Sequence, residues 1–172
     1  MSDLSFRSED SRFGLHVPAL QVRRILHFCM LAGRKETGGV IAGLYNSQLT
    51  CAFVRTIGGP PPDSEAGHTW FKRGISGLGT WFDRLWHREN SHFLGEWHFH
   101  PFASPNPSAT DRKQMEKIAS DTNWQCKTPI LLIVGGDPRH QWSMTATVFP
   151  SGERPQHLTR VTSLDVSQGN QR

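Results

Sequence analysis

The residues best suited to chemistry lie in one short stretch of the chain. His98 and His100 are separated by a single residue, and Ser108 and Asp111 follow shortly after. Residues two apart on a strand point to the same face, so both imidazoles would face one side. Asp111 would lie in the first turn of a helix that is predicted to begin at Ser108. Two imidazoles and a carboxylate are three metal ligands, and zinc held by three protein ligands keeps a position for water, as in hydrolytic sites.

Hydrolysis by metal-bound water also needs a proton acceptor. The metal lowers the pKa of its water from 15.7 to about 7. A nearby carboxylate that takes this proton and passes it to the leaving amine contributes ~10²–10⁴ in rate. Glu36 is the best candidate, because it stands between a predicted helix and a predicted strand, and Gly38 and Gly39 after it permit close backbone approach.

Ser108 has two interpretations. Taken alone, Ser-x-x-Asp at a helix start favours an N-cap, with Asp111 in the place of the usual Glu of a capping box. Beside a metal, the hydroxyl could instead donate to the oxyanion of a tetrahedral intermediate. The histidines also have a non-catalytic interpretation as buried strand residues, but His98, His100 and Asp111 at this spacing favour the metal site. Glu96 is expected to be an ordinary exposed or hydrogen-bonded residue.

Composition limits the class of protein. The chain has 172 residues, enough for one domain with its own core, and 36% of them are hydrophobic. The net charge of +4 is scattered, so no nucleic-acid partner is expected. The three cysteines form no CxxC pair, which favours reduced thiols in a cytoplasmic protein. No leader-like start or long apolar run occurs, so neither secretion nor a membrane partner is supported.

Apolar periodicity predicts a chain of mixed helices and strands. We expect an α/β fold in a single domain over residues 1–150, with a mixed β-sheet flanked by helices, and a loose polar tail over 151–172. The predicted elements are a short edge strand within 1–16, helices over 18–33, 75–89 (with one buried face) and 108–120, strands over 37–45, 48–57, 93–99, 129–135 and 140–149, and a loop over 58–67.

These motifs resemble a known family. Glu36-Thr-Gly-Gly, then His98-Phe-His100-Pro, then Ser108 and Asp111 at their spacing, are similar to the JAMM (JAB/MPN) metalloprotease pattern. The resemblance covers roughly residues 18–149. It implies the JAB/MPN (cytidine-deaminase-like) fold and one Zn²⁺ ion held by the two histidines and Asp111. It also implies that Glu36 is the general base and acid and that Ser108 helps to stabilise the oxyanion.

The family activity implied is hydrolysis of isopeptide or peptide bonds after the C-terminal glycine of ubiquitin-like proteins. The partner would be a ubiquitin-like modifier or its protein conjugate. The small size and the short segment 121–129 look more like the prokaryotic JAB branch, and resemble the deubiquitinase-like isopeptidases of bacterial ubiquitin-like conjugation and anti-phage (CBASS-type) systems. Phe99 departs from the Ser or Thr common between the two histidines, and it is expected to point away from the ligands and pack inward.

Substrate contacts are less defined. Trp70, Phe71, Lys72 and Arg73 are candidates for the lip of a channel that admits an extended tail, bound by strand addition. An equally supported alternative is that Trp70 and Phe71 anchor the loop to the core. Two other functions remain open: a processing peptidase for a sulfur-carrier precursor, and a non-catalytic MPN-type binding scaffold.

Overall fold

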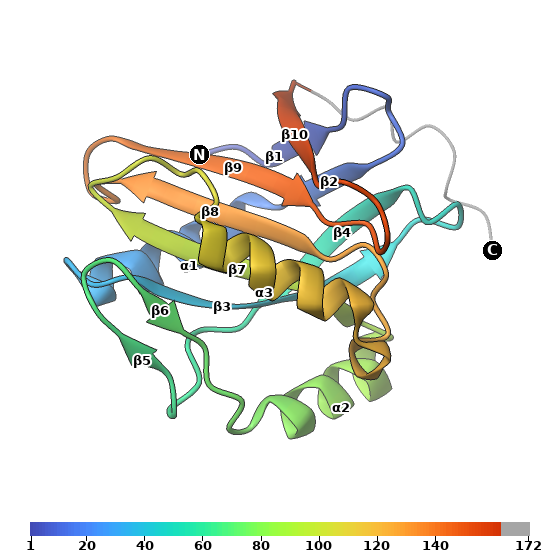
Figure 1. Ribbon diagram of the computed structural model, residues 1–172, viewed down its shortest axis with the longest axis horizontal. Coiled ribbons are helices and arrows are strands. Elements are labelled where there is room, and N and C mark those ends of the chain that lie inside the picture. Colours follow the sequence, from blue (N-terminus) through green and yellow to red (C-terminus); the bar gives the residue numbers. More distant parts are fainter. Residues whose placement is uncertain (163–172) are drawn as a thin grey trace.

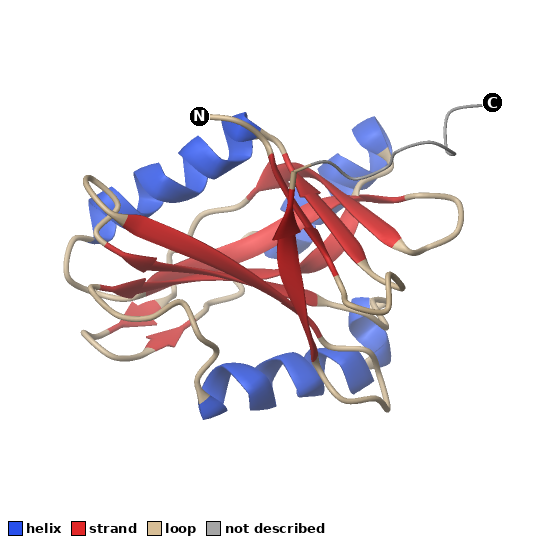
Figure 2. Cartoon of the chain, turned by 90° about the horizontal axis from the view of Figure 1, so that it is seen from above, coloured by secondary structure: helices blue, strands red, loops and turns tan. Residues whose placement is uncertain are grey.

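The computed structural model describes residues 1–162, which form a strand-rich molecule with helices on both sides (Figures 1 and 2). The helices are α1 (Ala19–Ala32), α2 (Leu78–Glu89) and α3 (Ala109–Ser120), followed by a 3₁₀ turn η1 (Thr122–Trp124). The strands are β1 (Leu4–Arg7), β2 (Gly14–Val17), β3 (Thr37–Tyr45), β4 (Cys51–Ile57), β5 (Glu65–Ala66), β6 (Phe71–Lys72), β7 (His92–Pro101), β8 (Ile130–Gly136), β9 (Trp142–Val148) and β10 (Gln156–Val161).

The long strands form one mixed sheet, as predicted. Their order is β1-β10-β9-β8-β7-β3-β4-β2, and β1 pairs with β2, so the sheet closes on itself. Strand β7 is parallel to β8 and antiparallel to β3. The small β5–β6 hairpin stands apart from this sheet (Figure 1). Strand β7 therefore lies between two long neighbours, and its carboxyl end is held on both sides.

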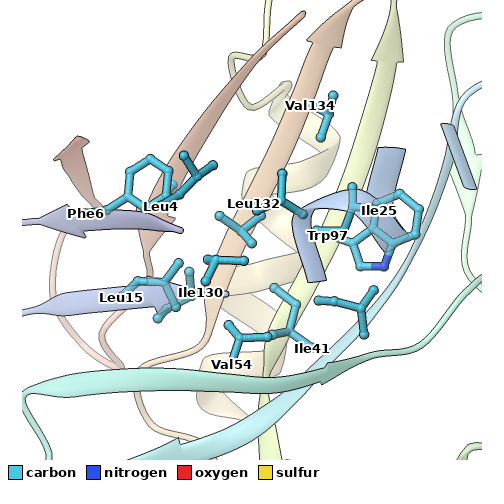
Figure 3. Close-up of a cluster of buried hydrophobic side chains, with 14 of the residues drawn as sticks. Leu4, Phe6, Leu15, Ile25, Ile41, Val54, Trp97, Ile130, Leu132 and Val134 are labelled. Carbon is cyan, nitrogen blue, oxygen red and sulfur yellow. The ribbon is translucent and has the colours of Figure 1, made fainter. Parts of the chain in front are cut away.

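Two apolar clusters lie on opposite faces of the sheet. One contains Ile25 of α1 and the buried Trp97 and Phe99 of β7, and Figure 3 shows part of it. The other contains Met115 of α3 and Ile133 of β8. Phe99 is fully buried in the α1-side cluster, so the prediction that it packs inward, away from the histidines, is confirmed.

A β-bulge in β7 decides which side chains face α3. Gly95 has φ +151, a Cβ there would collide with a carbonyl oxygen of β8, and the register with β3 shifts beside it. Phe93 and His98 are an odd number of residues apart, yet both lie on the α3 side. The extra residue of the bulge thus reverses the alternation and points His98 and His100 at the start of α3.

The structure corrects several predicted elements. Residues 156–161 are not loose tail, because β10 pairs with both β9 and β1; residues 163–172 of that segment lie outside the described residues. The expected single edge strand within 1–16 is two strands, β1 and β2, that close the sheet and leave no edge there. Part of the expected loop 58–67 forms β5.

Helix α2 also differs from its prediction. It begins at Leu78, and none of its residues is buried, although an apolar face was expected to be. Its half-buried Phe82 packs edge-on against Phe93 at 5.9 Å between ring centroids, and Trp86 is 49% exposed. Among the described residues, no helix combines the length and apolarity needed to cross a membrane.

Candidate metal centre

His98, His100 and Asp111 come together where the end of β7 meets the first turn of α3. One potential ligand atom from each residue lies within 4.8 Å of the other two. His98 Nδ1 lies 2.7 Å from Asp111 Oδ1, and His100 Nε2 lies 3.6 Å from Asp111 Oδ2. All three residues are largely shielded from solvent. The predicted cluster therefore exists as a compact group of two imidazoles and one carboxylate.

Asp111 has two roles in the fold. Its carboxylate accepts a hydrogen bond from the Ser108 backbone N–H at 2.7 Å, while the Ser108 hydroxyl accepts one from the Asp111 N–H at 3.1 Å. This is a reciprocal capping box, so the helix start itself fixes the carboxylate beside the histidines. Burial raises the pKa of Asp111, but its interactions with His100 and His98 outweigh this and hold the pKa well below its usual range.

The imidazole of His98 is enclosed by acidic groups. Its Nδ1 faces Asp111, and its Nε2 lies 3.4 Å from Glu96 Oε2. Burial disfavours the charged ring, but these two carboxylates outweigh it and raise the pKa of His98 to about 9. The acidic surroundings that favour the charged imidazole would also favour a bound cation.

Glu36 lies directly before β3, beside the cluster. The next residues pair with β7, Thr37 with Phe99 and Gly38 with His98, and the Glu36 N–H donates to the Gly67 carbonyl at 2.8 Å. The side chain is half-buried. Its pKa is raised, because burial disfavours the carboxylate and Asp111 repels it, effects that the histidines only partly offset. A raised pKa makes a carboxylate a stronger proton acceptor, which suits a general base.

The donor set fits a small divalent cation. Tetrahedral zinc ligands at about 2.0–2.1 Å from the ion stand roughly 3.4 Å apart. His100 lies 3.6 Å from Asp111 Oδ2, close to this spacing, and His98 lies 2.7 Å from the other oxygen, Oδ1, which is shorter than this spacing. Two imidazoles and a carboxylate are compatible with zinc among the first-row metals.

Sequence reasoning missed the part played by Glu96. Its carboxylate is fully buried, pairs with Arg73 at 2.8 Å and accepts a hydrogen bond from Gln114 at 2.6 Å. Of the two expected alternatives, an exposed or a hydrogen-bonded position, the hydrogen-bonded one is confirmed and the exposed one is wrong. One signal was available, because Glu96 stands two residues before His98 and so shares its face of the strand.

The proposed channel residues separate into two groups. Trp70 is 50% exposed and Lys72 is exposed, whereas Phe71 packs edge-on against His98 at 5.8 Å between ring centroids. The Arg73 side chain is only 6% exposed and points at Glu96, so it cannot form an open lip. His68, in the same segment, hydrogen-bonds through Nδ1 to the Arg34 carbonyl at 3.0 Å.

Comparisons with known proteins identify relatives of this chain. Residues 18–146 match the family of prokaryotic homologs of the JAB domain. A protein of Enterobacter hormaechei subsp. hoffmannii (strain UCI 50), named CD-NTase/cGAS isopeptidase, is 35% identical over 161 residues, which cover 94% of this chain and 89% of that protein.

Similarity to a solved structure concerns the fold alone. The solution structure of protein DSY2949 from Desulfitobacterium hafniense matches with a TM-score of 0.59 at 15% identity. The match covers 81% of this chain and 86% of that one.

Proposed function

The chain belongs to the prokaryotic JAB-domain family and is a hydrolase acting on peptide bonds, and we propose that it is a zinc-dependent isopeptidase that removes a ubiquitin-like modifier from a protein conjugate. The observation that carries this proposal is the meeting of His98, His100 and Asp111 beside Glu36. Three ligands with an adjacent half-buried carboxylate are what hydrolysis by bound water requires.

In this proposal, His98, His100 and Asp111 hold the ion, which when bound supplies an acidic water and polarises the scissile carbonyl. Glu36 takes the proton of the attacking water and delivers it to the departing lysine amine. Its raised pKa favours this exchange, because the carboxyl can hold the proton between the two steps. The Ser108 hydroxyl accepts from the Asp111 N–H, so its own proton is free to donate to the oxyanion.

The substrate would enter as an extended tail ending in glycine. Gly38 lies so close to His98 and Phe71 that a Cβ there would force one of them to move, and Phe71 covers one side of the imidazole. A tail that reaches His98 beside Phe71 would have to be slender, so we propose small residues before the scissile bond. The β5–β6 hairpin stands outside the main sheet and offers strand edges for main-chain pairing, with Trp70 and Lys72 exposed on it.

The name of the relative suggests the other half of the conjugate. That protein is named as an isopeptidase of CD-NTase/cGAS. We propose that a protein of this kind, carrying a ubiquitin-like modifier, is the conjugate cleaved here in a bacterial defence setting.

The test compares wild type, Glu36→Ala and Asp111→Ala on lysate of the source organism, each with and without a chelator. Wild type alone is expected to release C-termini ending in glycine and free lysines, and the chelator should abolish this. Glu36→Ala should retain bound zinc, whereas Asp111→Ala should lose it. Cleavage confined to the end of one small carrier protein would favour the processing peptidase, and zinc binding without any cleavage would favour the scaffold.

A further inference from the structure

The Glu96 carboxylate joins three elements beneath the metal centre. Arg73, immediately after β6, donates from Nε to Oε1 at 2.8 Å; Gln114 of α3 donates from Nε2 to Oε2 at 2.6 Å; and His98 Nε2 lies 3.4 Å from Oε2. The exposed fractions of the Arg73 and Glu96 side chains are 6% and 0%. None of the roles proposed above uses Glu96, Arg73 or Gln114.

Stability alone does not account for this arrangement. Removing a carboxylate and a guanidinium from water costs several kcal/mol per ion, and a buried pair rarely stabilises a fold more than apolar residues of the same volume. The Glu96 carboxylate instead contacts specific polar side chains. One of its contacts is with Nε2 of His98, and the other ring nitrogen of His98, Nδ1, faces Asp111. A metal-binding imidazole held by a carboxylate through its second nitrogen is a recurrent way of fixing ring orientation and tautomer.

We propose that Glu96 is a positioning residue which, held by Arg73 and Gln114, fixes the His98 ring so that the nitrogen facing Asp111 is presented to the metal. This inference rests on the metal site in the proposed function and deepens it. Gln114 lies one turn after Asp111 on α3, so the same helix supplies a ligand and supports the residue that orients another ligand.

The Arg73 anchor also connects the β5–β6 hairpin to the metal centre. Its guanidinium donates to the Gly74 carbonyl at 2.8 Å and lies 5.2 Å from the Trp124 ring centroid, so the start of the segment after β6 is fixed. Phe71, two residues earlier, rests its ring against His98. The ion pair between Arg73 and Glu96 therefore fixes the position of the hairpin, and with it the position of the Phe71 ring against His98.

The test measures zinc affinity by competition with a chromogenic chelator, which needs no substrate. Glu96→Gln keeps the size of the side chain and removes its charge, and zinc affinity is expected to fall 10–100-fold. The matched control is Glu65→Gln on the hairpin. The Glu65 carboxylate is exposed and its ion-pair partner there, Lys72, lies 4.0 Å away, so zinc affinity should not change.

Two further variants separate positioning from charge balance. Gln114→Ala removes one hydrogen bond from a partly exposed helix residue and should leave the fold intact while lowering zinc affinity about 10-fold. The double variant Glu96→Gln/Arg73→Met removes both buried charges. If Glu96 served only to neutralise Arg73, this double variant would regain wild-type affinity; if it orients His98, affinity stays low.

The outcomes distinguish this inference from the proposed function. Wild-type zinc affinity in Glu96→Gln or Gln114→Ala would overturn the positioning role and leave the isopeptidase proposal standing. A wild-type protein that fails to bind zinc would instead refute the proposed metal site itself. Reduced affinity in both variants, with melting temperatures measured in chelator close to wild type, would support the positioning role.

Discussion

Replacing Gly38 by alanine should displace His98, one of the proposed metal ligands, by direct steric contact. Gly38 pairs with His98 across β3 and β7. A Cβ at this position would lie 2.5 Å from the Trp97 carbonyl oxygen, 2.7 Å from Phe71 Cε1 and 2.8 Å from His98 Cδ2. Two of the three contacts cannot relax cheaply, since one is with backbone inside a paired strand and one is with a ring held among buried partners.

The size of the effect follows from these distances. Ordinary carbon contacts are about 3.5–4.0 Å, so the strand and the imidazole must retreat by roughly 0.7–1.5 Å. Overpacking of this kind costs about 1–3 kcal/mol, which in a chain of this length lowers the melting temperature by about 2–12 °C. A shift of about 1 Å in a group that positions the reaction lowers turnover about 100-fold.

The assay for Gly38→Ala combines melting in chelator, zinc competition and the rate of conjugate cleavage. Gly79→Ala is the matched control, because a Cβ at Gly79 in α2 meets nothing within 4 Å. It should gain about 0.5–1 kcal/mol from helix propensity and keep wild-type zinc affinity. Gly38→Ala with unchanged zinc affinity and turnover would refute the argument that close packing of β3 on β7 sets the ligand position.

Three further outcomes are expected. Ser108→Ala should lose about 1 kcal/mol of stability from the helix cap, and a drop in single-turnover rate of ~10²–10³ with zinc retained would be the sign of the oxyanion role. Phe99→Ala should lose about 3–5 kcal/mol in denaturant titration, because the ring is fully buried on the α1 side. In chelator, stability should fall between about pH 6.5 and about pH 9 and level off above, because folding raises the pKa of His98 from 6.5 to about 9 and the folded protein keeps a proton there that the unfolded chain loses; a His98→Asn variant should lack this fall.

The ligand cluster could be predicted from the sequence because its geometry is local. His98 and His100 share a strand face, and Asp111 occupies the first turn of the following helix, where the capping box of Ser108 fixes it. Elements with strong periodicity, such as the buried strand over 37–45, were placed correctly for the same reason. Only the placement of Glu36 depended on a contact between segments far apart in the sequence. The pairing of β3 with β7 makes that contact.

Elements that depend on partners far along the chain were harder to predict. Strand β10 has one buried residue, Leu158, among polar and exposed neighbours, so its sequence carries little apolar strand pattern. Its backbone pairing with β1 and β9 stabilises it as a strand. Helix α2 has the apolar stripe of a buried helix. This stripe instead lines one side of a cleft of about 640 Å³, which Phe93 and Trp124 also line. The prediction of a helix with an apolar stripe was therefore correct, whereas the prediction that the stripe is buried was wrong.

Glu96 shows how a polar residue in an apolar strand should be interpreted. Glutamate is almost never fully buried unless it is paired, so an exposed position is the reasonable expectation for one residue considered alone. Strand β7 is buried between two neighbours, however, and a residue two positions before a ligand must share its face. Burial then requires a cation, and the partner is Arg73, 23 residues earlier on a different element. The parity of the strand could have placed Glu96 at the metal centre, but only the tertiary structure could identify Arg73 as the residue that permits a second buried carboxylate beside Asp111.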